Sequence, residues 1–106
     1  MPAPTLENLI ADLQNPDAEV RLNAVVELGR HREEQVVAEL CRTLLEDPDS
    51  SVRYLAARYL GKIGDSHAAE ALEMAALQDF EESDSGDTVS RAATVALRLV
   101  RDNSLQ

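Results

Sequence analysis

The sequence predicts an all-α protein, a short α-α superhelix of three stacked helix pairs. The chain is rich in Ala, Leu and Val but only 3% aromatic, which favours packed helices. Its apolar residues recur at steps of three and four, the period of an amphipathic helix, and no alternating strand pattern competes with them. A proline-centred motif also appears twice, 32 positions apart, which indicates a repeat architecture.

The repeated motif marks where helices stop and start. The segment NPDAEVR at 15–21 returns as DPDSSVR at 47–53. Each proline ends the helix before it, because the residue that precedes a proline is pushed out of the α region. The aspartate after each proline, Asp17 or Asp49, can then cap the next helix and favour the positive end of its dipole.

In chain order, the first half holds three expected helices. A short helix over 5–14 carries apolar residues at helical steps, and a helix over 17–30 starts at the first proline motif. We interpret Gly29, near the end of that helix, as a left-handed cap residue. A helix over 33–46 follows, because its apolar residues again recur at steps of three and four.

The second half repeats this order. The helix over 50–63 starts at the second proline motif and contains Gly61, which we interpret as another left-handed cap. A helix over 66–79 follows, and a degenerate third copy of the motif gives the helix over 87–101. Three helix pairs in one domain over 1–106 are close to the minimum that can bury a continuous core.

The string N/D-P-D-x-x-V-R-x-x-A, followed by L-G-R/K and a second helix, resembles the HEAT-like repeat of the phycobilisome-lyase type. The copies cover nearly the whole chain, two of them closely. Similar repeats occur in lyases and lyase-like factors that attach, move or remove bilin chromophores on phycobiliproteins. The resemblance therefore implies a bilin lyase-like or phycobiliprotein-associated function as an alternative, although it identifies no bilin-contacting residue.

Charge and composition argue against several classes of protein. Twenty acidic and ten basic residues leave a net charge of −10, which argues against a nucleic-acid partner, since phosphate backbones require clustered Lys and Arg. No apolar run approaches the ~20 residues of a membrane span. The amino terminus also lacks the features of a signal peptide, so we expect a cytoplasmic protein with no membrane partner. The single cysteine excludes an intramolecular disulfide.

Arg21 and Arg53 occupy the same place in the two close copies of the motif. They could bind anions, but an arginine in the first turn of such a repeat is typical of an ion pair that ties repeats together. We therefore interpret both as structural, with Asp17 and Asp49 as their expected partners.

The chain shows no catalytic constellation. Cys41 lies within an apolar set, so we expect a core residue rather than a nucleophile. His31 and His67 lie near helix ends without convergent partners, which favours surface positions over metal ligation. Since no motif for a nucleophile, a metal or a phosphate is present, we expect no enzyme activity, no cofactor and no metal site.

The segment 79–87 holds five acidic residues and is also the insertion in the third copy. Its spacing does not fit a calcium-binding EF-hand loop. Two interpretations stay open, a solvated mobile loop or a specific contact loop. Phe80, the only phenylalanine, is expected to anchor the start of this loop to the core.

The leading functional interpretation is a non-catalytic adaptor or scaffold that binds a protein partner, or a regulatory subunit of an enzyme complex. In a solenoid the second helices line one face, and the exposed residues expected there are mainly acidic. A partner with a basic surface would therefore be favoured. The candidate partner-binding residues are Glu7, Asp12, Glu39, Arg42, Glu46, Glu70 and Met74.

A second candidate surface is the last helix, over 87–101. Val95 and Leu99 are expected on the flank of this helix that no fourth repeat covers. An apolar pair rimmed by arginines can associate with its own copy or with a partner. Weak homodimerisation or partner docking through this helix is therefore a second hypothesis.

Overall fold

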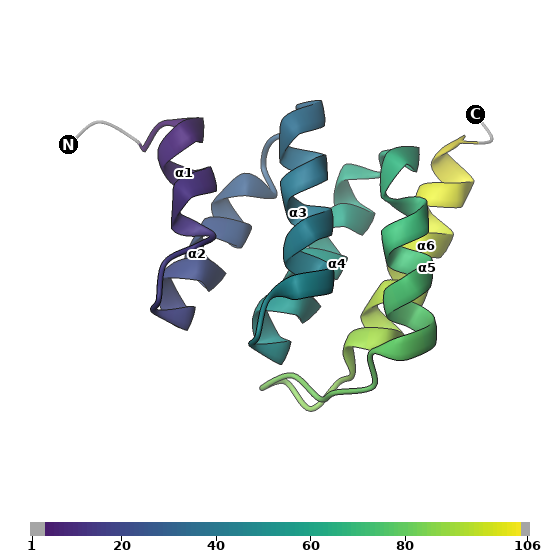
Figure 1. Cartoon of the computed structure of the whole chain (residues 1–106). Helices are drawn as coiled ribbons and strands as arrows, with labels where there is room; N and C mark the ends of the chain where they lie inside the picture. The colour runs from purple at the N-terminus through teal and green to yellow at the C-terminus, as the bar shows by residue number, and fades with distance from the viewer. Residues whose placement is uncertain (1–3, 105–106) are drawn as a thin grey trace.

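The computed structural model describes residues 4–104. The elements are α1 Leu6–Asp12, α2 Ala18–Leu28, α3 Glu34–Glu46, α4 Ser50–Ile63, the 3-10 turn η1 Ser66–Ala68, α5 Ala69–Gln78 and α6 Val89–Ser104. The helices α1, α3 and α5 form one layer, and α2, α4 and α6 form the other (Figure 1). Apart from one isolated bridge between Glu82 and Thr88, the described residues contain no β-structure. The all-α superhelix predicted from the sequence is therefore confirmed.

The proline motifs start the helices as predicted. Asp17 accepts a hydrogen bond from the Glu19 backbone N–H at 2.9 Å and so caps α2. Asp49 caps α4 in the same way and accepts hydrogen bonds from the backbone N–H groups of Ser51 at 2.8 Å and Val52 at 3.2 Å. Both capping predictions are confirmed, and each contact satisfies backbone donors that have no partner within the helix.

Two glycines have a different role from the one expected. Gly29 has a right-handed φ of −61°, and Gly61 lies inside α4, so the left-handed residue that ends α4 is Gly64, with a φ of 74°. A Cβ on Gly29 would lie 2.2 Å from Tyr59 Cδ1, and a Cβ on Gly61 would lie 2.9 Å from Ala96 Cα. The interpretation as left-handed caps is therefore wrong, because both glycines allow the next repeat to pack closely.

Small residues also fill the core where helices meet. Ala56 in α4 is fully buried, so a leucine there would add volume to packed surroundings. Ala56→Leu is expected to lower the free energy of unfolding by about 1–3 kcal/mol, measured by urea melting followed by circular dichroism. Ala38→Leu adds the same atoms on the exposed surface of α3 and should change stability by less than about 0.5 kcal/mol. Equal melting of Ala56→Leu and wild type would contradict this packing.

The main chain of the segment 79–87 is bonded to the start of α4. The Ser50 hydroxyl donates to the Glu82 carbonyl at 2.7 Å, and the Asp84 backbone N–H donates to the Ser51 hydroxyl at 2.8 Å. Most of its residues are nevertheless exposed to solvent. These hydrogen bonds join the third repeat to the second, and both interpretations of the segment, a solvated loop or a specific contact loop, stay open.

No helix in residues 4–104 is long and apolar enough to cross a lipid bilayer.

Candidate functional site

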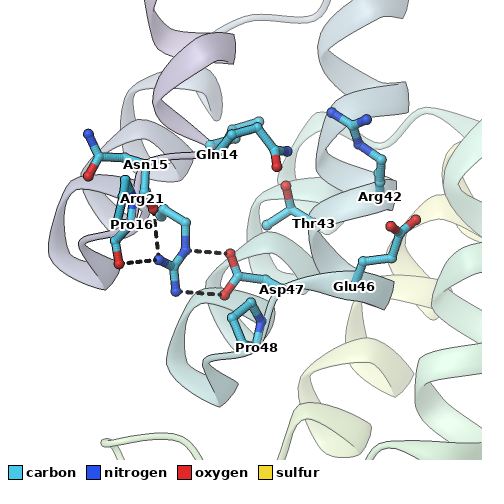
Figure 2. Close-up of a pocket in the computed structure, with 10 residues that line it drawn as sticks. Gln14, Asn15, Pro16, Arg21, Arg42, Thr43, Glu46, Asp47 and Pro48 are labelled. Atoms are coloured by element: carbon cyan, nitrogen blue, oxygen red, sulfur yellow. Dashed lines mark hydrogen bonds and ion pairs between the residues drawn. The ribbon is translucent and has the colours of Figure 1, made fainter.

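Arg21 ties the first repeat to the second through four hydrogen bonds from its guanidinium group. Its Nε and Nη2 donate to the two carboxylate oxygens of Asp47 at 2.9 and 3.3 Å. Its Nη1 donates to the backbone carbonyls of Asn15 and Pro16 at 2.9 and 3.1 Å, as Figure 2 shows. Both charged side chains are almost completely buried, so the pair is a structural contact rather than a free anion site.

The same arrangement recurs one repeat later at Arg53. Its Nε and Nη2 donate to Asp79 at 2.7 and 3.3 Å, and its Nη1 donates to the Asp47 carbonyl at 2.9 Å. The hydrogen bond to Asp79 raises the pKa of Arg53 above its usual range, and the nearby Glu81 carboxylate adds to the effect. Asp47 thus contacts one arginine with its side chain and the other with its backbone, which makes an inter-repeat ladder of Arg21–Asp47 and Arg53–Asp79.

The prediction that these arginines pair with Asp17 and Asp49 is wrong. Their carboxylates face the N–H groups of their own helices, whereas each guanidinium reaches the residue that follows the next helix of the other layer. In the third copy Ser90 replaces the arginine, and its hydroxyl donates to the Ala76 carbonyl at 2.6 Å. The ladder therefore ends where the described repeats end.

A groove of about 420 Å³ lies above the first step of the ladder, between the segment that follows α1 and the end of α3. Its open side is polar, with Gln14, Arg42, Thr43 and Glu46 around it (Figure 2). Arg42 forms an ion pair with Glu39 on the same helix. Since Arg21 at the base is paired with Asp47 and Arg42 is paired with Glu39, this groove offers little free positive charge to an anion.

The next groove, of about 330 Å³, lies between α3 and α5 and has both charged and large apolar side chains in its lining. Leu45, Met74 and Phe80 line it and are all exposed, with Glu81 beside them. Phe80 is 65% exposed, so the expectation that it anchors the loop to the core is wrong. Adjacent Leu44 is buried, and because neighbouring residues of a helix face different directions, Leu45 is left at the surface.

We call the outward surface of α1, α3 and α5 the odd-helix face. The described part of this face has exposed side chains at Glu7, Arg42, Glu46, Glu70 and Met74, whereas Asp12 and Glu39 are half-buried. Arg42 and Glu46 lie at the first groove, and Met74 lies at the second. Sequence reasoning missed the exposed Leu45 and Phe80, which contribute much of the apolar surface at the second groove.

Val95 and Leu99 line a third groove, of about 360 Å³, between α4 and α6. A Cβ on Gly61 would lie 3.4 Å from Leu99 Cδ1, so this side chain lies against α4. The expectation that the pair lies on the terminal flank is therefore wrong. Ala96 of α6 packs against Gly61 of α4. Val95 and Leu99 lie beside Ala96 at the groove, where they are partly exposed to solvent.

Cys41 packs partly buried against the core, as the sequence indicates. Burial raises the pKa of its thiol from 9.0 to about 11, so the reactive thiolate is scarce near neutral pH. We expect a thiol reagent to label the native protein at least about tenfold more slowly than the urea-unfolded protein. Rapid stoichiometric labelling of the native protein would contradict this result and would support a covalent role for Cys41.

The two histidines lie beside single carboxylates. His31 Nδ1 is 3.3 Å from Glu33 Oε2, and His67 Nδ1 is 2.7 Å from Asp65 Oδ1. The hydrogen bond that Asp65 accepts from the His67 backbone lowers the pKa of Asp65, and the side-chain contact raises the pKa of His67. Within residues 4–104, no group of three or more His, Cys, Asp or Glu side chains is placed to hold a metal ion.

Helix pairs stacked in two layers and joined by a repeated Arg–Asp ladder define an α-solenoid repeat protein. The family model described as HEAT repeats matches residues 6–98, and the chain belongs to this family. Its repeats are of the HEAT-like phycobilisome-lyase type, as the motif predicts.

The chain is also similar to a solved chain in the complex of CpcE and CpcF of phycocyanin lyase from Nostoc sp. PCC7120. The two share 30% sequence identity with a TM-score of 0.75, over 95% of this chain. This chain spans only 39% of the length of that one. No curated protein matches the sequence.

Proposed function

We propose that this protein is a non-catalytic interaction module, an adaptor or scaffold that binds a protein partner through its odd-helix face. The observation that carries the proposal is the second groove, where Leu45, Met74 and Phe80 are exposed together beside carboxylates. Single exposed apolar side chains are common on any protein surface. Several of them gathered at one groove are typical of a contact surface. Membership of the HEAT-repeat family supports the same class of function.

The charge of the odd-helix face determines what kind of partner fits it. Glu46 is exposed at the first groove, and Glu70 is exposed one turn before Met74 on α5. The one arginine on α3, Arg42, is paired with Glu39. A partner surface with an apolar side chain surrounded by Lys or Arg would complement this pattern. The proposal places the module in the cytoplasm, with neither nucleic acid nor a membrane as its partner.

The absence of catalysis is part of this proposal. The buried arginines are bonded to aspartates, and the Cys41 thiol is kept protonated near neutral pH by its raised pKa. Neither group is free to act as a nucleophile or to stabilise developing negative charge in a groove. A regulatory subunit, with the activity in its partner, would use the same face.

A partner captured from an extract of the source organism should depend on Met74. Met74→Glu places a charge beside the exposed Leu45 and Phe80 in the second groove and is expected to weaken binding about tenfold or more. Leu77→Glu is the matched control, because Leu77 is exposed on the same helix but does not line the groove. Binding constants for both variants, measured with the purified partner, decide the question. Equal loss in the two variants, or none in either, would contradict the groove as the contact.

A second candidate is a phycobiliprotein-associated or bilin lyase-like factor, which the 30% identity to the phycocyanin lyase structure favours. Incubating the protein with free bilin and recording the absorbance spectrum tests it directly. A shifted visible band with folded protein, absent with urea-unfolded protein, would support this candidate. An unchanged spectrum would leave the adaptor as the function.

A further inference from the structure

The groove between α4 and α6 has the opposite charge from the odd-helix face. Tyr54, Val95 and Leu99 give it an apolar floor, with Val95 52% and Leu99 48% exposed. Its basic rim consists of Arg58 and Lys62 from α4 and Arg91 from α6. We call this surface the α4/α6 groove.

Few carboxylates oppose the positive charge of this groove. Helix α4 contains three basic residues and no Asp or Glu, and the only acid of α6 is Asp102, near its end. Asp87 at the groove edge is 3.8 Å from Arg91, a loose contact between exposed side chains. The rim therefore keeps a net positive charge on a protein whose total charge is −10.

The aromatic rings hold two of these cations close to the surface. The Arg58 guanidinium lies 5.8 Å from the centroid of the Tyr54 ring, and Lys62 Nζ lies 5.3 Å from the centroid of the Tyr59 ring. Contacts of this kind orient a long side chain while leaving its charged end accessible. Of the two rings, only Tyr54 lines the groove, so Arg58 is the positive charge that is held beside the apolar strip.

We propose that the α4/α6 groove binds an acidic amphipathic segment of a protein partner. Apolar side chains of the segment pack on Val95, Leu99 and the Tyr54 ring, and its carboxylates face the basic rim. Charge complementarity selects this occupant, since a basic segment would meet like charges and a small free anion would leave the apolar strip uncovered. A symmetric pairing of this groove with the same groove of a second copy is disfavoured, because the two basic rims would repel each other.

This inference rests on the proposed interaction function and extends it to a second surface. The odd-helix face and the α4/α6 groove lie on different layers of the solenoid, so two partners of opposite charge could bind at the same time (Figure 1). Such a protein would bridge a basic partner and an acidic one.

The test uses a short fluorescent helical peptide with leucines at positions i and i+4 and glutamates on both flanks. A second peptide has lysine in place of every glutamate. The groove variant is Arg58→Glu/Arg91→Glu, and the matched control is Arg30→Glu/Arg98→Glu, which changes the net charge equally at exposed positions outside the groove. Fluorescence anisotropy gives the affinities, and circular dichroism verifies that both variants fold.

Wild type is expected to bind the acidic peptide, the groove variant to bind it about tenfold more weakly or worse, and the control to match wild type within about twofold. The inference is overturned if wild type does not bind, if the lysine peptide binds equally well, or if both variants lose affinity alike. It is also overturned if sedimentation shows a wild-type dimer that the groove variant separates, because a second copy then fills the groove. None of these results depends on Met74→Glu, so failure here is distinguishable from failure of the odd-helix face.

Discussion

Asp47→Ala is expected to lower the free energy of unfolding by about 3 kcal/mol or more. The substitution leaves the Arg21 guanidinium buried with its charge uncompensated, although its two carbonyl contacts remain. Removing one member of a buried ion pair costs more than the pair contributes, because the other charge cannot regain water. Urea unfolding followed by circular dichroism measures the change.

Asn15→Ala is the matched control for this result. Asn15 occupies the same place in the first motif, and its side chain accepts the Asp17 backbone N–H just as Asp47 accepts the Asp49 backbone N–H. Only Asp47 also receives a guanidinium, so Asn15→Ala should cost about 1 kcal/mol or less. Similar losses in the two variants would mean that the ladder adds nothing beyond the local turn.

A double substitution separates the buried charge from the lost contact. Arg21→Met/Asp47→Leu removes both members of the pair and fills their space with apolar atoms. It should be clearly more stable than Asp47→Ala, because no unpaired charge is left in the interior. If the double variant is as unstable as Asp47→Ala, the ladder stabilises the protein by shape and backbone contacts rather than by compensating charge.

The helices and their caps could be predicted because the information is local. An aspartate that caps a helix bonds to N–H groups two or three residues away, so Asp17 and Asp49 are recognisable within a short motif. The helical period is likewise local, because it is recognised from apolar residues three and four positions apart. The match to the HEAT-repeat family extends over residues 6–98, which include both copies of this motif.

The ladder and the grooves could not be predicted in the same way, because they depend on how repeats stack. Each arginine pairs with a residue 26 positions later, across one connection and the helix that follows it. One signal was available. The first motif begins with Asn15 and the second with Asp47. Only the second motif has a motif arginine, Arg21, in the repeat before it, and this arginine pairs with the Asp47 carboxylate. The exposure of Phe80 had no comparable signal, since it depends on a loop folded back onto α4.

The close contact between α4 and α6 gives the second large effect. Gly61→Leu is expected to lower the free energy of unfolding by about 3 kcal/mol or more, because the new side chain has no space against the α6 backbone. The same position is in the middle of a helix, where almost any residue except proline would otherwise improve stability. Thermal melting measures the loss, and an unchanged melting temperature would contradict the contact.

Gly61→Ala gives the sharper test, because helix propensity and packing predict opposite signs. Propensity alone would stabilise the protein by about 1 kcal/mol. The alanine Cβ would lie 2.9 Å from both Cα and Cβ of Ala96, so we expect a net loss instead. Ala96→Gly removes one of those two atoms, and in the double variant Gly61→Ala/Ala96→Gly part of the loss should be recovered relative to the sum of the single changes. Additive effects in this double-mutant cycle would show that the two positions do not touch, and a gain in stability from Gly61→Ala alone would show that propensity outweighs packing between these helices.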